Sequence, residues 1–352
     1  MREHRLYRPG SVSPAARLRT LRKALLLSLF TALTLSMLLE NEKALALSLN
    51  GLNLWFEKMI PTLLPFMILS GILIRMNLSD SFARLFSPLL SPLFRLSDSC
   101  LYVLVIGFLC GFPMGARVTA ESLQRGRLTR REASLMLAFC NNIGPIYFSG
   151  FVLALFPVAN PLPFWAGMYL LPLCYGLLLR WTVYRDIPAA KRHPAKPSAA
   201  RALARILHAA SLPSRPGDAS AQSPALPRTP SLLEQMQDSV MSSLISISAL
   251  GGYMILFSLM NLLPDLLLPA KAFHACSLCA CLLEITSGLS GLGSSNAFWG
   301  FVLLPFGGLS CIAQTYSMIR ETDLSLRQYV LHKCLQTLLA FLYYSALYSF
   351  FL

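Results

Sequence analysis

The sequence predicts an all-α, polytopic membrane protein built from two inverted repeats that contain broken or re-entrant helices. Composition is the first observation: 55% of the 352 residues are hydrophobic and 13% are charged, whereas a soluble domain carries roughly a quarter charged residues. Second, basic residues gather beside the apolar segments. Third, glycine and proline interrupt several of these segments, and two stretches of the chain resemble each other.

The net charge of +14 is distributed as in a membrane protein. Seven basic residues lie within the first 23 positions, and others crowd the segment after Trp181. Lys and Arg beside spans are typical of cytoplasmic segments. We therefore interpret the charge as a signal for membrane orientation, expect a cytoplasmic N-terminus, and expect no nucleic-acid partner.

The nine cysteines mostly lie in apolar runs, which indicates small buried residues and not a disulfide framework. Cys276, Cys279 and Cys281 form a tighter group near His274, but no histidine pattern with metal-ligand spacing accompanies them. Helix packing is the favoured interpretation of this group. We expect no metal site and no cofactor, apart from a coupling H⁺ or Na⁺.

The chain divides into a short N-terminus, two membrane repeats and the segments that join them. The apolar run 24–39 imitates a secretory signal, but it is longer than a signal's apolar region and the chain stays hydrophobic afterwards, which favours an uncleaved span. Residues 185–232 are rich in Pro, Ala, Ser and Arg without apolar periodicity, which predicts a flexible linker with a short helix at 199–210. The five parts are a basic cytoplasmic N-terminus (1–23), the first span with an amphipathic segment (24–58), the first membrane repeat (59–184), the flexible cytoplasmic linker (185–232) and the second membrane repeat (233–352).

In the first repeat, apolar segments alternate with interruptions. Segment 82–96 is apolar, but its two prolines and two arginines favour an interfacial or re-entrant segment. GFPMG at 111–115 stops one helix, and Thr129 with Glu132 forms a capping box that opens the next. The remaining apolar segments are 59–76, 100–110, 133–139, 146–156 and 163–181.

The second repeat resembles the first weakly and differs from it in charge. Its predicted spans are 239–263, 273–288, 297–311 and 329–352. Aligning Gly111 with Gly307 brings the charged turn 116–133 onto the turn 313–327. The first turn carries five arginines and two glutamates, or +3, and the second carries two basic and two acidic residues, or 0. By the positive-inside rule the first turn is cytoplasmic and the second external, so the repeats would be inverted, as in secondary transporters.

The sequence FCNNIGP places Asn141, Asn142, Gly144 and Pro145 where lipid-facing residues are expected. In lipid an unpaired backbone group costs several kcal/mol, so a helix break is tolerated only where it is packed in protein or lines a wet cavity. Pro145 lacks an N–H group and frees the carbonyl of Asn141. Two interpretations stay open: a proline kink patched by the amides, or a substrate or ion site.

Two other interruptions are candidate parts of the same site. Gly111, Pro113 and Gly115 predict a helix break whose terminus would face an ion or anion, with a tight turn for close packing as the alternative. Glu284 follows an apolar run and is flanked by Thr286 and Ser287. An ionisable residue at membrane depth is a functional candidate, and an interfacial glutamate is the alternative here.

These motifs resemble the signatures of a known family. The stretch GFPMGARVTAESLQRGRLTRREASLMLAFCNNIGP (111–145) is similar to the joint motif of the sporulation integral membrane protein YlbJ family, and LEITSG (283–288) is similar to its second motif. The resemblance implies a gate, or nucleoside-recognition, domain similar to concentrative nucleoside transporters. It also implies a spore-forming Gram-positive source and a role in the spore cortex.

The resemblance carries over candidate residues but no substrate. The second repeat lacks its own Asn-Asn-x-Gly-Pro motif, so any site is asymmetric. The carried-over residues are Gly111, Pro113, Gly115, Asn141, Asn142, Gly144, Pro145, Glu284 and Thr286, and the positions equivalent to the asparagine motif are Thr337, Leu338, Ala340 and Phe341.

We expect a cell-membrane transporter of a small polar solute needed for spore cortex formation. The alternative is a non-transporting membrane scaffold for spore-envelope assembly. An enzyme is disfavoured, because the sequence has neither a Ser-His pattern nor a metal cluster. The expected partners are the lipid bilayer and a small polar solute, and a homo-oligomer or other sporulation membrane proteins stay open.

Overall fold

The computed structural model describes residues 14–189, 231–267, 273–293 and 296–351, and every regular element in these ranges is a helix. Five helices are long and apolar enough to cross a membrane, and a bent helix pair is a sixth candidate. These findings confirm the predicted class: the protein is all-α and passes through the membrane several times. The five helices are Arg17–Leu39, Asn41–Arg75, Leu162–Trp181, Leu232–Pro264 and Ala297–Ile319.

The N-terminal part consists of α1 (Pro14–Leu39) and a long helix that runs from α2 (Asn41–Leu54) into α3 (Ile60–Arg75). A π-helical turn at Trp55–Met59 joins α2 to α3. The boundary that we drew at 58/59 therefore falls inside one continuous helix. Such a turn accommodates an interruption of the regular hydrogen bonds without ending the helix.

The next elements turn sharply. The helices α4 (Ser79–Ala83) and α5 (Ser87–Phe94) lead to α6 (Asp98–Cys110), and α5 meets α6 at 109°. This bend corresponds to the predicted interfacial or re-entrant segment. The helices α7 (Met114–Gln124) and α8 (Arg130–Phe139) follow, and the capping box of Thr129 and Glu132 is present at the start of α8.

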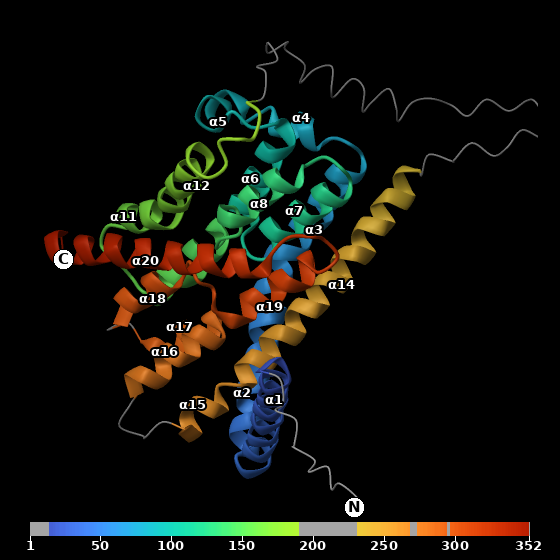
Figure 1. The fold of residues 1–352 in the computed structure, drawn as a ribbon. Coiled ribbons are helices and arrows are strands. Elements are labelled where there is room, and N and C mark those ends of the chain that lie inside the picture. Colours follow the sequence, from blue (N-terminus) through green and yellow to red (C-terminus); the bar gives the residue numbers. More distant parts are fainter. Residues whose placement is uncertain (1–13, 190–230, 268–272, 294–295, 352) are drawn as a thin grey trace, which may run out of the picture.

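The rest of the chain continues the bundle shown in Figure 1. The last described helix before the linker ends at the same end of the bundle at which the first helix after the linker begins (Figure 1). The predicted short helix at 199–210, most of the linker and the first 13 residues lie outside the described residues. The remaining elements are α9 (Pro145–Tyr147), a π-helical turn (Phe148–Val152), α10 (Leu153–Leu155), α11 (Leu162–Trp165), a π-helical turn (Ala166–Leu170), α12 (Leu171–Trp181), α14 (Leu232–Leu259), α15 (Leu262–Leu267), α16 (Phe273–Leu283), α17 (Ile285–Leu292), α18 (Ala297–Leu303), α19 (Gly308–Ile319) and α20 (Leu326–Phe351).

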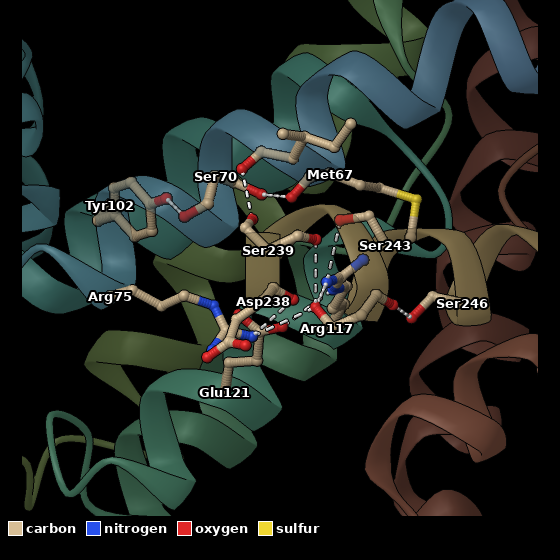
Figure 2. Close-up of polar contacts among 12 residues, drawn as sticks. Met67, Ser70, Arg75, Tyr102, Arg117, Glu121, Asp238, Ser239, Ser243 and Ser246 are labelled. Carbon is tan, nitrogen blue, oxygen red and sulfur yellow. Dashed lines mark hydrogen bonds and ion pairs between the residues drawn. The ribbon is translucent and has the colours of Figure 1, made fainter. Parts of the chain in front are cut away.

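A polar stripe on α14 ties the second half of the chain to α3 and α7, as Figure 2 shows. Arg117 of α7 is buried, donates from Nη2 to Ser242 Oγ over 2.9 Å, and pairs through Nε with Glu121 at 2.9 Å. At the end of α3, Arg75 Nη1 lies 3.8 Å from Asp238 Oδ2. Because buried polar groups are stabilised by hydrogen-bond partners, these contacts hold α14 against the first half, although Arg117 Nη1 itself has no partner among the described residues.

The charged turns that we assigned to opposite sides of the membrane lie against each other. Arg130 Nε is 2.9 Å from Asp323 Oδ2, and Arg130 Nη2 donates to the Asp323 carbonyl over 3.3 Å. Two turns in direct contact cannot lie across a hydrocarbon core about 30 Å thick. The predicted external position of 313–327, opposite a cytoplasmic 116–133, is therefore wrong.

The physical reason for this error is that the charges of the two turns pair with each other. The difference in net charge between the turns therefore does not report opposite sides of the membrane. The acidic residue of one turn neutralises an arginine of the other, so the two charges belong to one surface. Next to them, Arg131 donates to Asp186 over 2.9 Å, and this hydrogen bond lowers the pKa of the Asp186 carboxyl. The inverted relation of the two repeats rested on the contrast and is not confirmed.

Candidate functional site

Helix breaks from both halves of the chain meet at the centre of the molecule. The first two, between α6 and α7 and between α8 and α9, cross at a pair of glycines. A Cβ on Gly111 would collide with the backbone nitrogen of Gly144, and a Cβ on Gly144 would lie 2.8 Å from the carbonyl of Cys110. Gly111 also has φ +83°, a conformation that favours glycine. Glycine is therefore required where these two breaks touch.

The other two breaks, at Glu284 between α16 and α17 and at 304–307 between α18 and α19, also touch. A Cβ on Gly308 would lie 3.1 Å from the carbonyl of Cys281 and 3.2 Å from the nitrogen of Ile285. The ring of Phe112 lies 3.1 Å from the position of a Cβ on Gly307. The four breaks thus form one continuous layer.

The break after α8 is filled by side-chain hydrogen bonds. Asn141 is fully buried, and its Nδ2 donates to Thr315 Oγ1 and to the hydroxyl of Tyr329, both at 3.0 Å. Its Oδ1 accepts from the backbone nitrogen of Ala116 over 3.3 Å. That nitrogen lies in the first turn of α7, where no helical carbonyl is available. Asn141 therefore caps one broken helix and joins it to α19 and α20.

Asn142 belongs to a second buried network. Its Oδ1 accepts from Lys333 Nζ over 2.8 Å, and Lys333 Nζ also donates to Gln336 Oε1 over 3.0 Å. Gln336 Nε2 in turn donates to the carbonyl of Ala138 over 2.7 Å. Lys333 and Gln336 have no exposed surface, and Asn142 is 1% exposed. The network therefore links the end of α8 to the middle of α20.

The break at Glu284 is arranged differently. Glu284 is the N-cap of α17, and its Oε2 accepts from the nitrogen of Ser287 over 2.7 Å. Thr286 Oγ1 accepts from the hydroxyl of Tyr147 over 3.1 Å, and Asn261 Nδ2 donates to Ser287 Oγ over 3.4 Å. Glu284 is 2% exposed, and its position at a helix N-terminus favours the charged form of its carboxyl group.

A cavity opens beside the Glu284 break. The volume available to the centres of water-sized molecules is about 60 Å³. Its polar lining comes from Glu284, Thr286, Tyr147, Gln314 and Thr62, and its walls are apolar side chains from α3, α6, α14 and α19. An apolar pocket with a few convergent polar groups is the usual form of a small-molecule site.

The cavity takes in some of the residues that the motifs indicated. Of the candidates, Gly144, Glu284 and Thr286 line it. The candidates outside its lining are Gly111, Pro113, Gly115, Asn141, Asn142, Pro145 and Ser287. The two asparagines and Glu284 therefore belong to neighbouring but different parts of the central layer.

Sequence reasoning missed the long polar side chains of α20. Lys333 is an ionisable residue within an apolar helix, and the same rule that selected Glu284 would have selected it. Gln336 and Tyr329 have no comparable signal, because a single amide or phenol in a membrane helix is common. Within the described ranges, no three His, Cys, Asp or Glu side chains are grouped so that they could hold a metal ion.

Comparisons with known proteins show what this chain is similar to. Residues 56–156, which include α3 and the first two breaks, match the family model named Gate and described as nucleoside recognition. The chain is 26% identical over 338 residues to the sporulation integral membrane protein YlbJ of Bacillus subtilis (strain 168), covering 89% of this chain and 79% of that protein. No solved structure matches the chain.

The family resemblance that the motifs indicated is therefore confirmed as a resemblance: residues 56–156 match the Gate family model, and most of the chain is similar to the sporulation integral membrane protein YlbJ.

Proposed function

We propose that this protein is a transporter that moves a small polar solute across the cell membrane during spore formation, coupled to H⁺ or Na⁺. The observation that carries the proposal is the cavity beside the Glu284 break. Broken helices whose ends face a shared site are typical of secondary transporters. The name of the Bacillus relative supports the link to sporulation, and the Gate match supports recognition of a nucleoside-like solute.

The chemistry of the lining supports one class of solute. The carboxylate of Glu284 accepts hydrogen bonds, Gln314 both donates and accepts, and the hydroxyls of Thr286 and Tyr147 do both. A solute with hydroxyl or amine donors and one apolar face fits this lining. Because one water needs roughly 10–15 Å³ of such volume, the cavity of about 60 Å³ holds only a handful of water molecules. A nucleoside-sized solute therefore requires the surrounding helices to move apart.

The scaffold alternative has one observation in its favour. Asn141 and Asn142, in the most specific part of the shared motif, are both occupied by internal hydrogen bonds. A protein that uses this layer only for packing would show the same contacts. The Glu284 cavity favours transport, so the two candidates differ in whether any solute binds there.

A ligand screen separates these two functions. The purified protein is tested by thermal unfolding against nucleosides, sugars, amino acids and metal ions, since a ligand that binds only the folded state raises the apparent stability. A reproducible solute is then tested for uptake into proteoliposomes containing wild type or Glu284→Gln. Transport predicts solute-dependent stabilisation and uptake. A protein that no solute stabilises in this screen would favour the scaffold.

We propose that the N-terminus, the 185–232 linker and both charged turns face the cytoplasm. Basic residues concentrate in the N-terminus, the linker and the turn 116–133, and Asp323 ties the neutral turn 313–327 to Arg130 of that basic turn. Arg125→Cys and Arg320→Cys, made in a background without native cysteines, test this orientation in intact cells. Both positions should be protected from a membrane-impermeant thiol reagent and should react after the membrane is permeabilised. Labelling of position 125 from outside would contradict the orientation.

A further inference from the structure

Lys333 is a fully buried lysine whose amine is held by neutral groups. Its Nζ donates to Asn142 Oδ1 over 2.8 Å and to Gln336 Oε1 over 3.0 Å, and it lies 4.8 Å from the centre of the Phe112 ring. Among the ion pairs of the described residues, none includes Lys333. Burying an ammonium group without a carboxylate is costly unless other groups replace its hydration.

The end of α8 supplies that replacement. The helix ends at Phe139, so its last carbonyls have no helical N–H partner and carry partial negative charge. Gln336 Nε2 donates to the carbonyl of Ala138, and Asn142 Nδ2 donates to the carbonyl of Phe139. These two hydrogen bonds turn both amide oxygens toward the ammonium group of Lys333. The amides therefore extend the negative end of the broken helix to Nζ.

In secondary transporters, backbone carbonyls and the C-terminal ends of broken helices bind a coupling Na⁺. The amide oxygens of Asn142 and Gln336 are neutral oxygen ligands of the same kind at such an end. An aromatic face adds further attraction for a cation. We propose that the break after α8 is a monovalent-cation site and that its occupant is the ammonium group of Lys333. Lys333 is thus a tethered cation in a place where a free Na⁺ or K⁺ would otherwise bind.

The proposal bears on coupling only if the protein transports a solute, as proposed above. In that case the ammonium group of Lys333 takes the place of a free Na⁺ at this break, which favours H⁺ over Na⁺ as the coupling ion of the proposed transport. The site itself does not depend on transport. It can therefore be tested by cation binding alone, and its failure is distinguishable from failure of the transport proposal.

The test replaces the tethered cation by a free one. Lys333→Ala and wild type are unfolded thermally in NaCl, KCl, methylammonium chloride or choline chloride at equal ionic strength. The variant should unfold at a lower temperature in choline and be stabilised saturably by Na⁺, K⁺ or methylammonium, by about 3 °C or more, as for a ligand well above its Kd. Wild type should unfold at the same temperature in all four salts.

Two further variants sharpen the result. Lys58→Ala removes an exposed lysine and should show no preference among the four salts. The double variant Lys333→Ala/Gln336→Ala lacks one of the two oxygen ligands and should lose most of the cation effect. If Lys333→Ala cannot be purified, Lys333→Met, which keeps the apolar stem, takes its place.

Equal stability of the Lys333 variant in choline and in the three small cations would overturn the proposal. So would a wild-type protein that small cations stabilise as strongly as the variant. Failure of both Lys333 variants to accumulate in membranes at any salt composition would also count against it, because a free cation would then be unable to replace the tethered one.

Discussion

The break after α8 and the break at Glu284 both place polar side chains in the middle of membrane helices, yet they are built differently. At the first, Asn141 and Asn142 are occupied by partners on α7, α19 and α20. At the second, Glu284 caps α17 and also lines a cavity. The two breaks therefore differ in how their polar side chains are used: the asparagines of the first are taken up by internal hydrogen bonds, whereas Glu284 borders open space, a cavity that Ile143 and Gly144 also line.

The difference comes from α20. This helix of 26 residues continues unbroken through the positions equivalent to the asparagine motif. Tyr329, Lys333 and Gln336 are spaced as i, i+4 and i+7 and so share one face of α20. They fill the break after α8. Among the hydrogen bonds of the described residues, none joins a side chain of α20 to Glu284. At that break, Cys311 and Gln314 of α19 border the cavity.

The largest effect is expected where the breaks cross. A Cβ on Gly115 would collide with the carbonyl of Cys140 and lie 2.8 Å from Asn141 Cα, so Gly115→Val should destabilise the protein by at least about 3 kcal/mol. Membrane abundance and unfolding temperature measure this loss. Gly150→Val is the matched control, because a Cβ on Gly150 would meet nothing within 4 Å. Equal abundance of the two variants would show that the breaks do not cross as described.

An intermediate effect is expected at the filled break. The variant Asn141→Ala should lower the free energy of unfolding by about 1–3 kcal/mol, because Thr315, Tyr329 and the nitrogen of Ala116 lose a partner. Immunoblotting beside a sporulation assay checks this. Loss of function at unchanged abundance would instead favour direct solute contact.

The smallest effect on stability is expected at the open break. In Glu284→Gln the amide oxygen can still accept from the nitrogen of Ser287, so the free energy of unfolding should change by about 1 kcal/mol or less. Solute binding or pH-dependent uptake should change more than stability. Glu284→Asp, which keeps the carboxylate, should retain part of the uptake. Normal resistant-spore counts with Glu284→Gln would show that the charge of this carboxylate is dispensable.

Sequence patterns predicted the local features well because those features depend on nearby residues. Gly144 with Pro145 marked one break, Glu284 marked another, and Thr129 with Glu132 marked a helix start. Contacts between distant segments could not be predicted in this way. The pairing of Arg130 with Asp323 places on one side of the membrane two turns that were expected on opposite sides, and the contact of Lys333 with Asn142 joins residues 191 positions apart.

Three native cysteines test the central contrast most directly. Cys110 and Cys311 line the cavity, whereas Cys140 lies fully buried in the filled break. Wild-type protein is treated with methyl methanethiosulfonate, a small uncharged thiol reagent, and the modification rate of each cysteine is followed by mass spectrometry. A cavity beside Glu284 and a filled break after α8 predict that Cys110 and Cys311 react much faster than Cys140. Reaction of Cys140 at the same rate or faster would contradict the account.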